Sequence, residues 1–174
     1  MQIRTAAPAD AASVAAIYDY YVRHTAITFA DHTPSPEEYA RQMADARYPF
    51  LVAEEGGRVV GFAYAAPFRT KEAYRWDVEL TIYADPMHIG VGIGKGLMAV
   101  CLEKLREMGY LNAYSCITLP NERSVGLHRR FGFEELGMFQ KTGYKLGKWH
   151  DVIWMGYVLG NFDDTPGEPG QQRP

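Results

Sequence analysis

Four glycines at alternate positions, in the stretch HIGVGIGKGLM (residues 88–98), constrain this chain more than any other feature. Before them lies an alternating segment rich in Val, Ile, Tyr and Trp, WDVELTIYA; after them comes LMAVCLEKLREMG, with apolar residues at helical spacing. These patterns predict a strand, a glycine loop and a helix of about four turns, in that order. Glycine lets backbone N–H groups approach a ligand closely, and the first turn of a helix leaves such groups unpaired. The order therefore predicts a site for phosphate oxygens.

Two phosphate-binding loops share this order, and the spacing of the glycines excludes both. A dinucleotide fingerprint, G-x-G-x-x-G, meets Lys95 or Leu97 where it needs its third glycine. A Walker loop, G-x-x-x-x-G-K-[ST], meets Ile89 and Gly96 where it needs a glycine and a hydroxyl. The pattern that remains, x-G-x-G-x-G over residues 89–94, resembles the pyrophosphate loop of the GNAT family of N-acetyltransferases.

Length and composition limit the class of protein. The chain has 174 residues, of which 47% are apolar, and a formal charge of −3. These values fit one globular domain, which we place at residues 1–160. Residues 161–174, NFDDTPGEPGQQRP, contain few apolar groups and three prolines, so we expect a flexible tail there.

The same composition argues against several partners. The mild acidity and the lack of a Lys/Arg run argue against nucleic acid or an anionic membrane as the principal partner. No apolar run is long enough to span a bilayer, and MQIRTAAPAD has no apolar signal core, so we expect a cytoplasmic enzyme. Cys101 and Cys116 show neither metal-ligand spacing nor a nucleophile pattern, and we interpret both as core residues.

The rest of the chain predicts one alternating series of strands and helices. A hairpin signal, Gly56-Gly57, lies between FLVAEE and RVVGFAYAAPF. The other expected elements are a strand at IRTA, helices from Pro8 to about Val22 and from Pro34 to about Arg47, a strand over about 112–118, a helix over about 121–131, and strands around FEELGMFQKT and KWHDVIWMGYVL.

The strand before the glycine loop has one polar face. Alternate positions place Asp77, Glu79, Thr81 and Tyr83 on that face, and Trp76, Val78, Leu80 and Ile82 on the other. Taken alone, the polar face is typical of a half-exposed strand with solvated carboxylates. Because the strand ends at the phosphate loop, the face is also placed to line the ligand cleft, where burial raises a carboxylate pKa toward neutrality. Glu79 is therefore the candidate general base.

A second motif, ITLPNERSVGLHRRFGF, follows the glycine helix. It resembles the acetyltransferase pattern N-x-x-A-x-x-L-Y-x-x-x-G-F, with Asn121 at the asparagine and His128 at the tyrosine. The resemblance implies that the Asn121 amide binds the pantetheine arm of CoA and that His128, as imidazolium, protonates the departing thiolate. The structural alternatives are a helix N-cap for Asn121 and a packing histidine for His128.

Longer segments narrow the resemblance to one group within this family. YPFLVAEEGGRVVGFAYAAPFRTKEAYRWDVELTIYADP, LPNERSVGLHRRFGF and GYKLGKWHDV resemble the phosphinothricin, methionine sulfoximine and methionine sulfone N-acetyltransferases. The resemblance implies an α+β sandwich, with a mixed, mostly antiparallel sheet of six or seven strands flanked by helices. It also implies a homodimer, to which the C-terminal strands contribute.

The same resemblance implies a co-substrate site for acetyl-CoA, where two neighbouring strands of the sheet splay apart, and no metal. The backbone groups of Ile82, Tyr83 and Ala84 would pair with the pantetheine arm like a neighbouring strand. A backbone N–H near Tyr83 or Ala84 would stabilise the oxyanion, while Glu79 accepts the proton of the substrate amine. The N–H groups that would hold the pyrophosphate belong to Gly90, Val91, Gly92, Ile93, Gly94 and Lys95.

The substrate is expected to be a small amine of amino-acid type. Arg69 and Arg75 are the candidate partners for its carboxylate, and Thr81 lies on the polar face beside them. Ile89 stands where the family usually has Gln or Arg, so we expect one side-chain contact to the pyrophosphate to be lost, with His88 next to it placed to compensate. Asp77 stands where close relatives tend to have Thr or Ser. The extra carboxylate favours a neutral sulfone or a cationic amine over a phosphinate. The alternatives are acetylation of a protein N-terminus or lysine, and a non-catalytic acyl-CoA-binding module.

Overall fold

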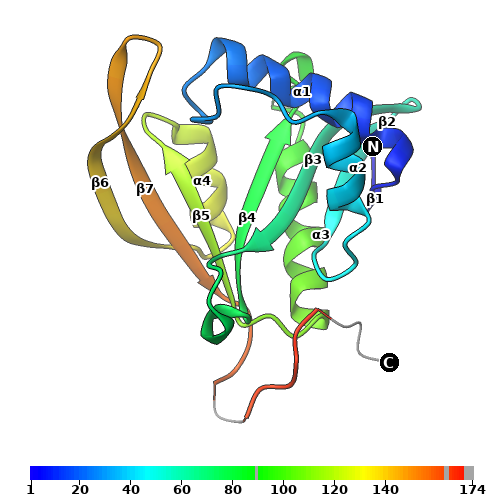
Figure 1. Ribbon diagram of the computed structural model, residues 1–174, viewed down its shortest axis with the longest axis vertical. Coiled ribbons are helices and arrows are strands. Elements are labelled where there is room, and N and C mark those ends of the chain that lie inside the picture. Colours follow the sequence, from blue (N-terminus) through cyan, green and yellow to red (C-terminus); the bar gives the residue numbers. More distant parts are fainter. Residues whose placement is uncertain (89, 163–164, 171–174) are drawn as a thin grey trace.

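A single seven-stranded sheet forms the centre of the protein in the computed structural model, which describes residues 1–88, 90–162 and 165–170 (Figure 1). Its strands are β1 (Gln2–Thr5), β2 (Phe50–Glu55), β3 (Arg58–Pro67), β4 (Asp77–Ala84), β5 (Asn112–Thr118), β6 (Glu134–Lys145) and β7 (Lys148–Val158). They lie in the order β1-β2-β3-β4-β5-β7-β6. Neighbours run antiparallel except β4 and β5, which run parallel. The expected fold class, a mixed and mostly antiparallel sheet, is confirmed.

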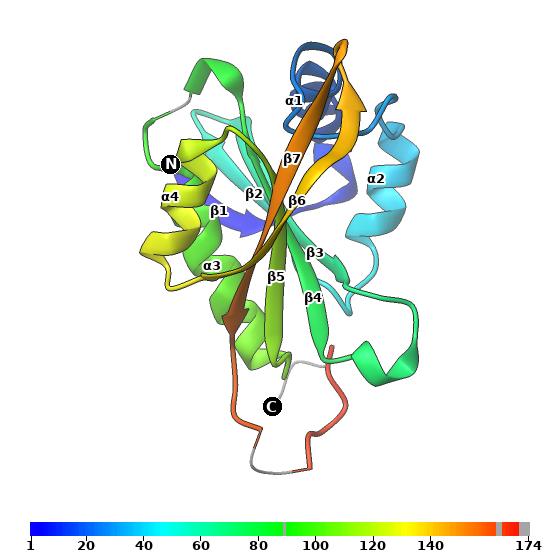
Figure 2. The same ribbon diagram turned by 90° about the vertical axis from the view of Figure 1, so that its left-hand side faces the viewer.

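Helices cover both faces of the sheet. They are α1 (Ala11–His24), α2 (Pro36–Met43), α3 (Ile93–Glu107) and α4 (Glu122–Arg130). Figure 2 shows α1 and α2 on one side of the sheet and α3 and α4 on the other. Each side has its own apolar core: one is built around Leu97, Met98 and Leu105 of α3, and the other around Val14 of α1 and Tyr39 of α2. No described helix is both long enough and apolar enough to cross a bilayer.

Local signals explain most element boundaries. Gly56 and Gly57 both have positive φ, 57° and 76°, which is the backbone that a two-residue hairpin between β2 and β3 requires. Ser35 and Glu38 form a capping box at the start of α2. This helix ends at Met43, short of the expected Arg47, because the Asp45 carboxylate accepts a bond from the Arg47 N–H and holds a turn instead.

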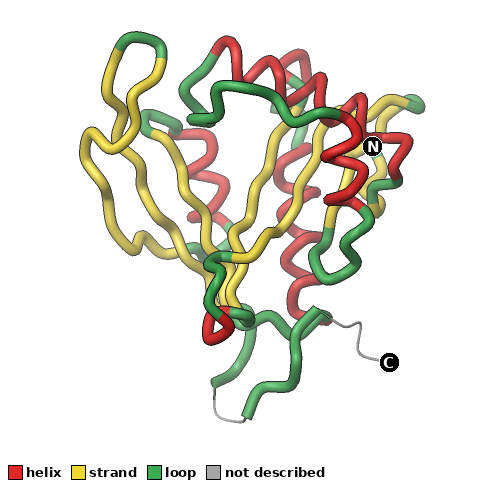
Figure 3. Tube along the Cα trace, in the orientation of Figure 1, coloured by secondary structure: helices red, strands yellow, loops and turns green. Residues whose placement is uncertain are grey.

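Strands β4 and β5 stay paired over only three residues. Asp77, Val78 and Glu79 lie opposite residues 112–114, and beyond them the two strands diverge (Figures 1 and 3). Among the described residues, β4 therefore has a strand neighbour on its β3 side only from Leu80 onward. We call this opening, bounded by residues 80–84 of β4 and residues 115–118 of β5, the fork.

The segment between α1 and α2 lies against the far end of the β6–β7 hairpin. The Lys145 ammonium donates to the Thr28 carbonyl at 2.7 Å. A Cβ atom at Gly143 would lie 2.1 Å from the Phe29 ring, so only glycine leaves room for this contact. The segment thus closes one end of the sheet face that carries Glu79.

Part of the expected tail contacts the domain. The indole N–H of Trp76 donates to the Gly167 carbonyl at 2.8 Å, and the Gly170 N–H donates to the Met108 carbonyl at 2.9 Å. Arg75 forms an ion pair with Glu168 at 3.2 Å. Residues 165–170 therefore run back along the domain instead of leading away from it.

Candidate active site

Glu79 lies at the apex of the fork, on the last paired position of β4. Register places it beside Ala66 of β3 and Tyr114 of β5, with its side chain on the face covered by α1 and α2. Burial raises the pKa of its carboxyl above the usual range, while the positive charge of Arg69 opposes the rise. A half-buried carboxylate with a raised pKa, at the end of a strand, suits proton acceptance from an amine.

Asp77 and Tyr83, two other residues of the predicted polar face, lie in different surroundings. Asp77 accepts a 2.7 Å bond from the Asn112 amide, which joins β4 to β5 below the fork. The ring of Tyr83 packs against Tyr18, Tyr21 and Phe62 beneath α1, so its side chain belongs to the core. Alternation assigned Tyr83 to the correct face, but not to the correct environment.

The backbone of β4 presents alternate residues to the fork. The Leu80 carbonyl points across it and accepts a 3.2 Å bond from the Ser115 hydroxyl of β5. Because backbone groups alternate along a strand, Ile82 and Ala84 face the fork as Leu80 does, whereas Tyr83 faces its partner Phe62 on β3. The structure therefore offers Ile82 and Ala84, but not the backbone of Tyr83, to a ligand in the fork. The Ala84 carbonyl already accepts the Tyr21 hydroxyl at 2.6 Å.

The glycine loop has the backbone that a phosphate cradle requires. Gly90 and Gly92 have φ values of 95° and 90°, and a Cβ atom on either would meet nothing within 4 Å, so the space above them is open. Gly92 is the N-cap of α3, and the Gly96 N–H donates to its carbonyl at 3.0 Å. The N–H groups of residues 93–95 precede that bond and stand at the helix N-terminus.

Two predictions concern the residues just before the loop. Ile89 lies outside the described residues, so the structure leaves its predicted effect untested. The His88 imidazole lies 3.1 Å from the Asp85 carboxylate, and that contact turns it toward the end of β4.

Asn121 and His128 lie at opposite ends of α4, and both carry structural bonds. Asn121 is the N-cap of α4, where its side-chain oxygen accepts the Ser124 N–H at 3.2 Å. His128 is buried: Nδ1 lies 2.8 Å from the Ser124 carbonyl, and Nε2 lies 3.0 Å from the Ser115 hydroxyl. Burial lowers the pKa of His128, against the opposing effect of the Ser124 carbonyl. The neutral ring is therefore the favoured form, whereas the role that the resemblance implies needs the imidazolium.

The two candidate arginines are placed differently. The Arg69 guanidinium lies over the Phe68 ring, 4.2 Å from its centroid, and 5.9 Å from the Trp154 ring. Its positive charge opposes the rise in the pKa of Glu79. Arg75 instead donates to the Glu72 carbonyl and pairs with Glu168. The structure thus brings Arg69, but not Arg75, toward Glu79.

An aromatic wall beside Glu79 was not expected from the sequence. The Phe68 ring lies 4.4 Å from that of Tyr114 and 5.8 Å from that of Trp154. Alternation within β5 and β7 places Tyr114 and Trp154 on the face of Glu79, so that signal was available. Cys116 lies on the same face and is exposed, so its interpretation as a core residue is wrong, whereas Cys101 is buried as expected.

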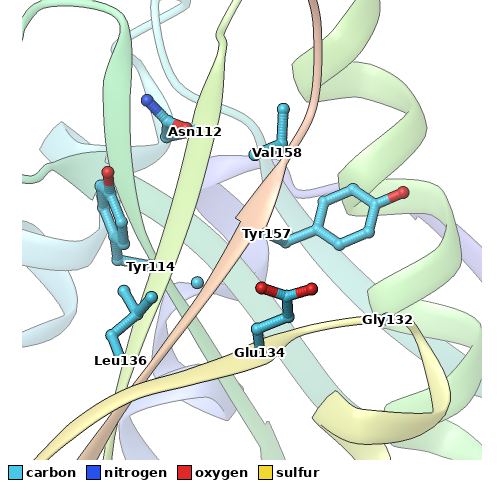
Figure 4. A pocket seen from close by; sticks show the side chains of 8 residues that line it. Asn112, Tyr114, Gly132, Glu134, Leu136, Tyr157 and Val158 are labelled. Carbon is cyan, nitrogen blue, oxygen red and sulfur yellow. The ribbon is translucent and has the colours of Figure 1, made fainter.

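A cavity of about 360 Å³ opens on this face next to Tyr114 (Figure 4). Tyr114, Asn112 and Leu136 line one side in the figure, and Glu134 and Val158 lie opposite them. Gly156 forms part of the lining, and a Cβ there would lie 2.7 Å from Leu136 and 3.2 Å from Tyr114. Among the described residues, no group of three or more His, Cys, Asp or Glu side chains is arranged to hold a metal ion.

Comparison with known proteins places this geometry in a family. The acetyltransferase (GNAT) domain model matches residues 3–154. The chain is 36% identical to phosphinothricin N-acetyltransferase of Streptomyces viridochromogenes, over 100% of this chain and 94% of that protein. It is 34% identical to L-methionine sulfoximine/L-methionine sulfone acetyltransferase of Salmonella typhimurium, over 89% and 92% of the two chains.

Solved structures agree with this placement. A phosphinothricin acetyltransferase of Sinorhizobium meliloti, in complex with acetyl-CoA, superposes with a TM-score of 0.91 at 35% identity, over 96% of this chain and 93% of that one. The family model and these relatives define the protein as an acyltransferase enzyme. The chain belongs to the GNAT family of acetyltransferases.

Proposed function

We propose that this enzyme transfers an acetyl group from acetyl-CoA to the amino group of a small, amino-acid-like substrate of the phosphinothricin, methionine sulfoximine or methionine sulfone type. The observation that carries the proposal is the position of Glu79, a half-buried carboxylate with a raised pKa at the apex of the fork. The names of the relatives and the acetyl-CoA bound in the Sinorhizobium meliloti structure support it.

The residues of the fork and of the glycine loop fit acetyl-CoA. The open space over Gly90 and Gly92 suits a pyrophosphate, which the N–H groups of residues 90–95 would hold. Ile82 and Ala84 face the fork and would pair with the pantetheine arm as a β-strand does. When bound, acetyl-CoA supplies an acetyl group activated as a thioester.

Glu79 would remove the proton that keeps the substrate amine from attacking. An ammonium group has no lone pair, so a base must accept a proton before the new C–N bond forms. The raised pKa of Glu79 brings its proton affinity closer to that of the amine, and the opposing charge of Arg69 favours the ionised form that can accept the proton. Direct attack needs no covalent acyl-enzyme, so the exposed Cys116 would be dispensable.

Arg69 is the stronger candidate for the substrate carboxylate. Its guanidinium is held over the aromatic wall and lies close enough to Glu79 to influence it, so an α-amino acid would place its two charged groups against opposite charges. Thr81 lies on the same face two residues along β4. Arg75 would contribute only if its pair with Glu168 opened.

We propose further that two copies of this chain associate through the β6–β7 hairpin. Its exposed large apolar side chains are Leu136, Met138, Phe139, Tyr144, Leu146, Trp149 and Val158. A monomeric protein rarely leaves so many large apolar groups in water on one element. A second copy of the chain offers the same surface and can bury both at once through a twofold contact.

A substrate screen tests the proposed activity. Purified protein would be mixed with acetyl-CoA and one amine at a time, with release of the CoA thiol followed by a thiol reagent and the product by mass spectrometry. The panel holds phosphinothricin, methionine sulfoximine, methionine sulfone, common amino acids and peptides with free N-termini. We expect N-acetylated small amino acids. Acetylation of the peptides alone would overturn the substrate class, and no thiol release with any amine would overturn the activity.

A further inference from the structure

A buried hydrogen-bond network of Leu80, Ser115 and His128 joins three elements at the apex of the fork. Ser115 lies on β5, one residue beyond the last position paired with β4, and only 2% of its surface is exposed. Its hydroxyl oxygen lies 3.2 Å from the Leu80 carbonyl of β4 and 3.0 Å from Nε2 of His128 on α4. The side chain of Ser115 thus occupies the place where the next bond between the two strands would otherwise form.

The protonation state of the His128 ring decides which atoms of this network donate and which accept hydrogen bonds. A carbonyl oxygen accepts only, so Nδ1 of His128, 2.8 Å from the Ser124 carbonyl, must carry a hydrogen. In the neutral ring Nε2 has a lone pair, and the Ser115 hydroxyl donates its single hydrogen to it. In the imidazolium Nε2–H donates to the Ser115 oxygen, and the hydroxyl is then free to donate to the Leu80 carbonyl. The network therefore has two bonding states, one for each charge of His128, and the Leu80 carbonyl receives the Ser115 hydrogen only when the ring is protonated.

The rest of the pocket does little to stabilise a charge on the ring. The Phe133 ring lies edge-on at 4.9 Å and the Ser124 hydroxyl lies 3.5 Å from Nδ1. Within the described ranges, no charged side chain forms a hydrogen bond or ion pair with His128. Two sets of hydrogen bonds therefore stabilise the buried imidazolium: the bond to the Ser124 carbonyl, and the bonds that run through the Ser115 hydroxyl to the Leu80 carbonyl.

We propose that Ser115 is a catalytic residue that lets His128 hold a proton beside the fork and passes a proton on to the departing thiolate. The proposal rests on the proposed function, because the fork is where the departing thiolate would lie. The proton on Nε2 moves to the Ser115 oxygen while the hydroxyl proton moves to the thiolate sulfur. Ser115 ends as a neutral hydroxyl, His128 ends as a neutral imidazole, and the ring regains its proton from water.

The first test measures the pKa of His128 directly, on the full chain without ligands. Its imidazole C–H signals would be followed by NMR against pH, with His128→Gln used for assignment. In Ser115→Ala both forms of the ring lose a hydrogen bond, but the bond lost by the imidazolium involves a charged donor and is the stronger one. We therefore expect the pKa of His128 to fall by about one unit. Ser124→Ala is the matched control: it removes a hydroxyl near the same ring and keeps the backbone carbonyl, so the pKa should stay where it is.

The second test uses the acetylation assay. We expect Ser115→Ala to lower kcat about tenfold, with KM for acetyl-CoA and for the amine within about twofold of wild type. Because the acid must be protonated, the alkaline limb of its pH profile should move to lower pH. Ser115→Thr keeps the hydroxyl and should restore both the limb and kcat. Ser115→Cys keeps the volume of the side chain with a weaker donor, and is the variant to use if Ser115→Ala fails to fold. It should change kcat and the alkaline limb in the same direction as alanine.

Two results would overturn the proposal. One is a His128 pKa that is the same in wild type, Ser115→Ala and Ser115→Cys. The other is an unchanged kcat in these variants while the wild-type protein is active. A lowered pKa in a protein that acetylates no amine would contradict the proposed function instead, since the pairing of Ser115 with His128 would stand without a reaction to serve.

Discussion

The carboxylate of Glu79 is subject to two opposing influences, and one of them can be removed by mutation. Burial raises its pKa and the charge of Arg69 lowers it. Arg69→Gln should therefore raise the pKa of Glu79 further. Because the base works only when ionised, the acid limb of the kcat/KM profile should move to higher pH, by about half a unit.

The same substitution removes the proposed partner of the substrate carboxylate. KM for the amine should rise about tenfold, as expected for the loss of a charge-assisted hydrogen bond. Arg75→Gln is the control, because Arg75 pairs with Glu168 and is not directed at Glu79. An acid limb that shifts equally in both variants, or in neither, would contradict the role given to Arg69.

Two substitutions of Asn121 can distinguish its structural role as a helix cap from a role in binding acetyl-CoA. Its side-chain oxygen caps α4, so Asn121→Ala should lower the free energy of unfolding by about 1 kcal/mol, measured by urea denaturation. Asn121→Asp keeps the accepting oxygen and loses the amide hydrogens. It should keep the stability and, if the amide binds the pantetheine arm, weaken acetyl-CoA binding in calorimetry. Full affinity in Asn121→Asp would leave Asn121 with the cap alone.

The surroundings of a single residue could be predicted from the sequence only where its neighbours in space are also close in the sequence. Glu79 was placed correctly because strand alternation is a local property. The pairing of Arg75 with Glu168 and of His128 with Ser115 joins residues far apart in the chain, and no spacing rule contains it. The aromatic wall of Phe68, Tyr114 and Trp154 was missed because it draws on three segments.

The glycine loop and α3 form one element whose stability and ligand binding can be compared. Gly92 has φ of 90° at the N-cap, where a side chain is strained by about 1–2 kcal/mol. Gly92→Ala should lower the free energy of unfolding by that amount and weaken acetyl-CoA binding, because the loop must distort. Both quantities come from denaturation with and without the ligand.

Gly126→Ala is the matched control for this element. Gly126 lies within α4, and an added Cβ there would meet nothing within 4 Å. Alanine should therefore stabilise that helix by about 0.5–1 kcal/mol and leave acetyl-CoA binding unchanged. Equal effects of the two substitutions on binding would contradict a phosphate cradle at Gly92.

Elements with strong local signals were predicted well. The hairpin at Gly56-Gly57 and the strand, loop and helix around residues 77–107 are confirmed, because glycine punctuation and apolar periodicity act over a few residues. The end of α2 was placed too late, because Asp45 diverts the chain into a turn. The fork itself, where β4 and β5 part, came only with the family resemblance.

The oligomeric state is the prediction that concerns the whole molecule. If the apolar residues of the β6–β7 hairpin join two copies, the wild-type protein should elute and scatter light as a dimer. Trp149→Lys places a charge in that surface and should give a monomer, since an unpaired buried charge is costly. Tyr20→Lys changes an exposed aromatic on α1 and should remain a dimer. A wild-type monomer at micromolar concentration would contradict the proposal.

For the whole molecule, the sequence predicts the fold class but not how its ends are arranged. Alternating strands and helices together with the family motifs lead to the seven-stranded sheet. The contacts of residues 165–170 with Trp76 and Met108 were not expected, since a segment poor in apolar groups carries no periodic signal. Those contacts depend on backbone carbonyls and N–H groups, which every sequence possesses.

A comparison of Glu79→Gln with the wild-type enzyme, in both catalysis and acetyl-CoA binding, tests whether Glu79 removes the proton of the substrate amine. Glutamine keeps the shape of the side chain and removes the base, so kcat should fall at least 100-fold while the Kd of acetyl-CoA stays within about twofold. Glu103→Gln, at an exposed position of α3, should leave both quantities unchanged. A Glu79→Gln enzyme with kcat within about threefold of wild type would contradict the account of the fork as the site of proton removal.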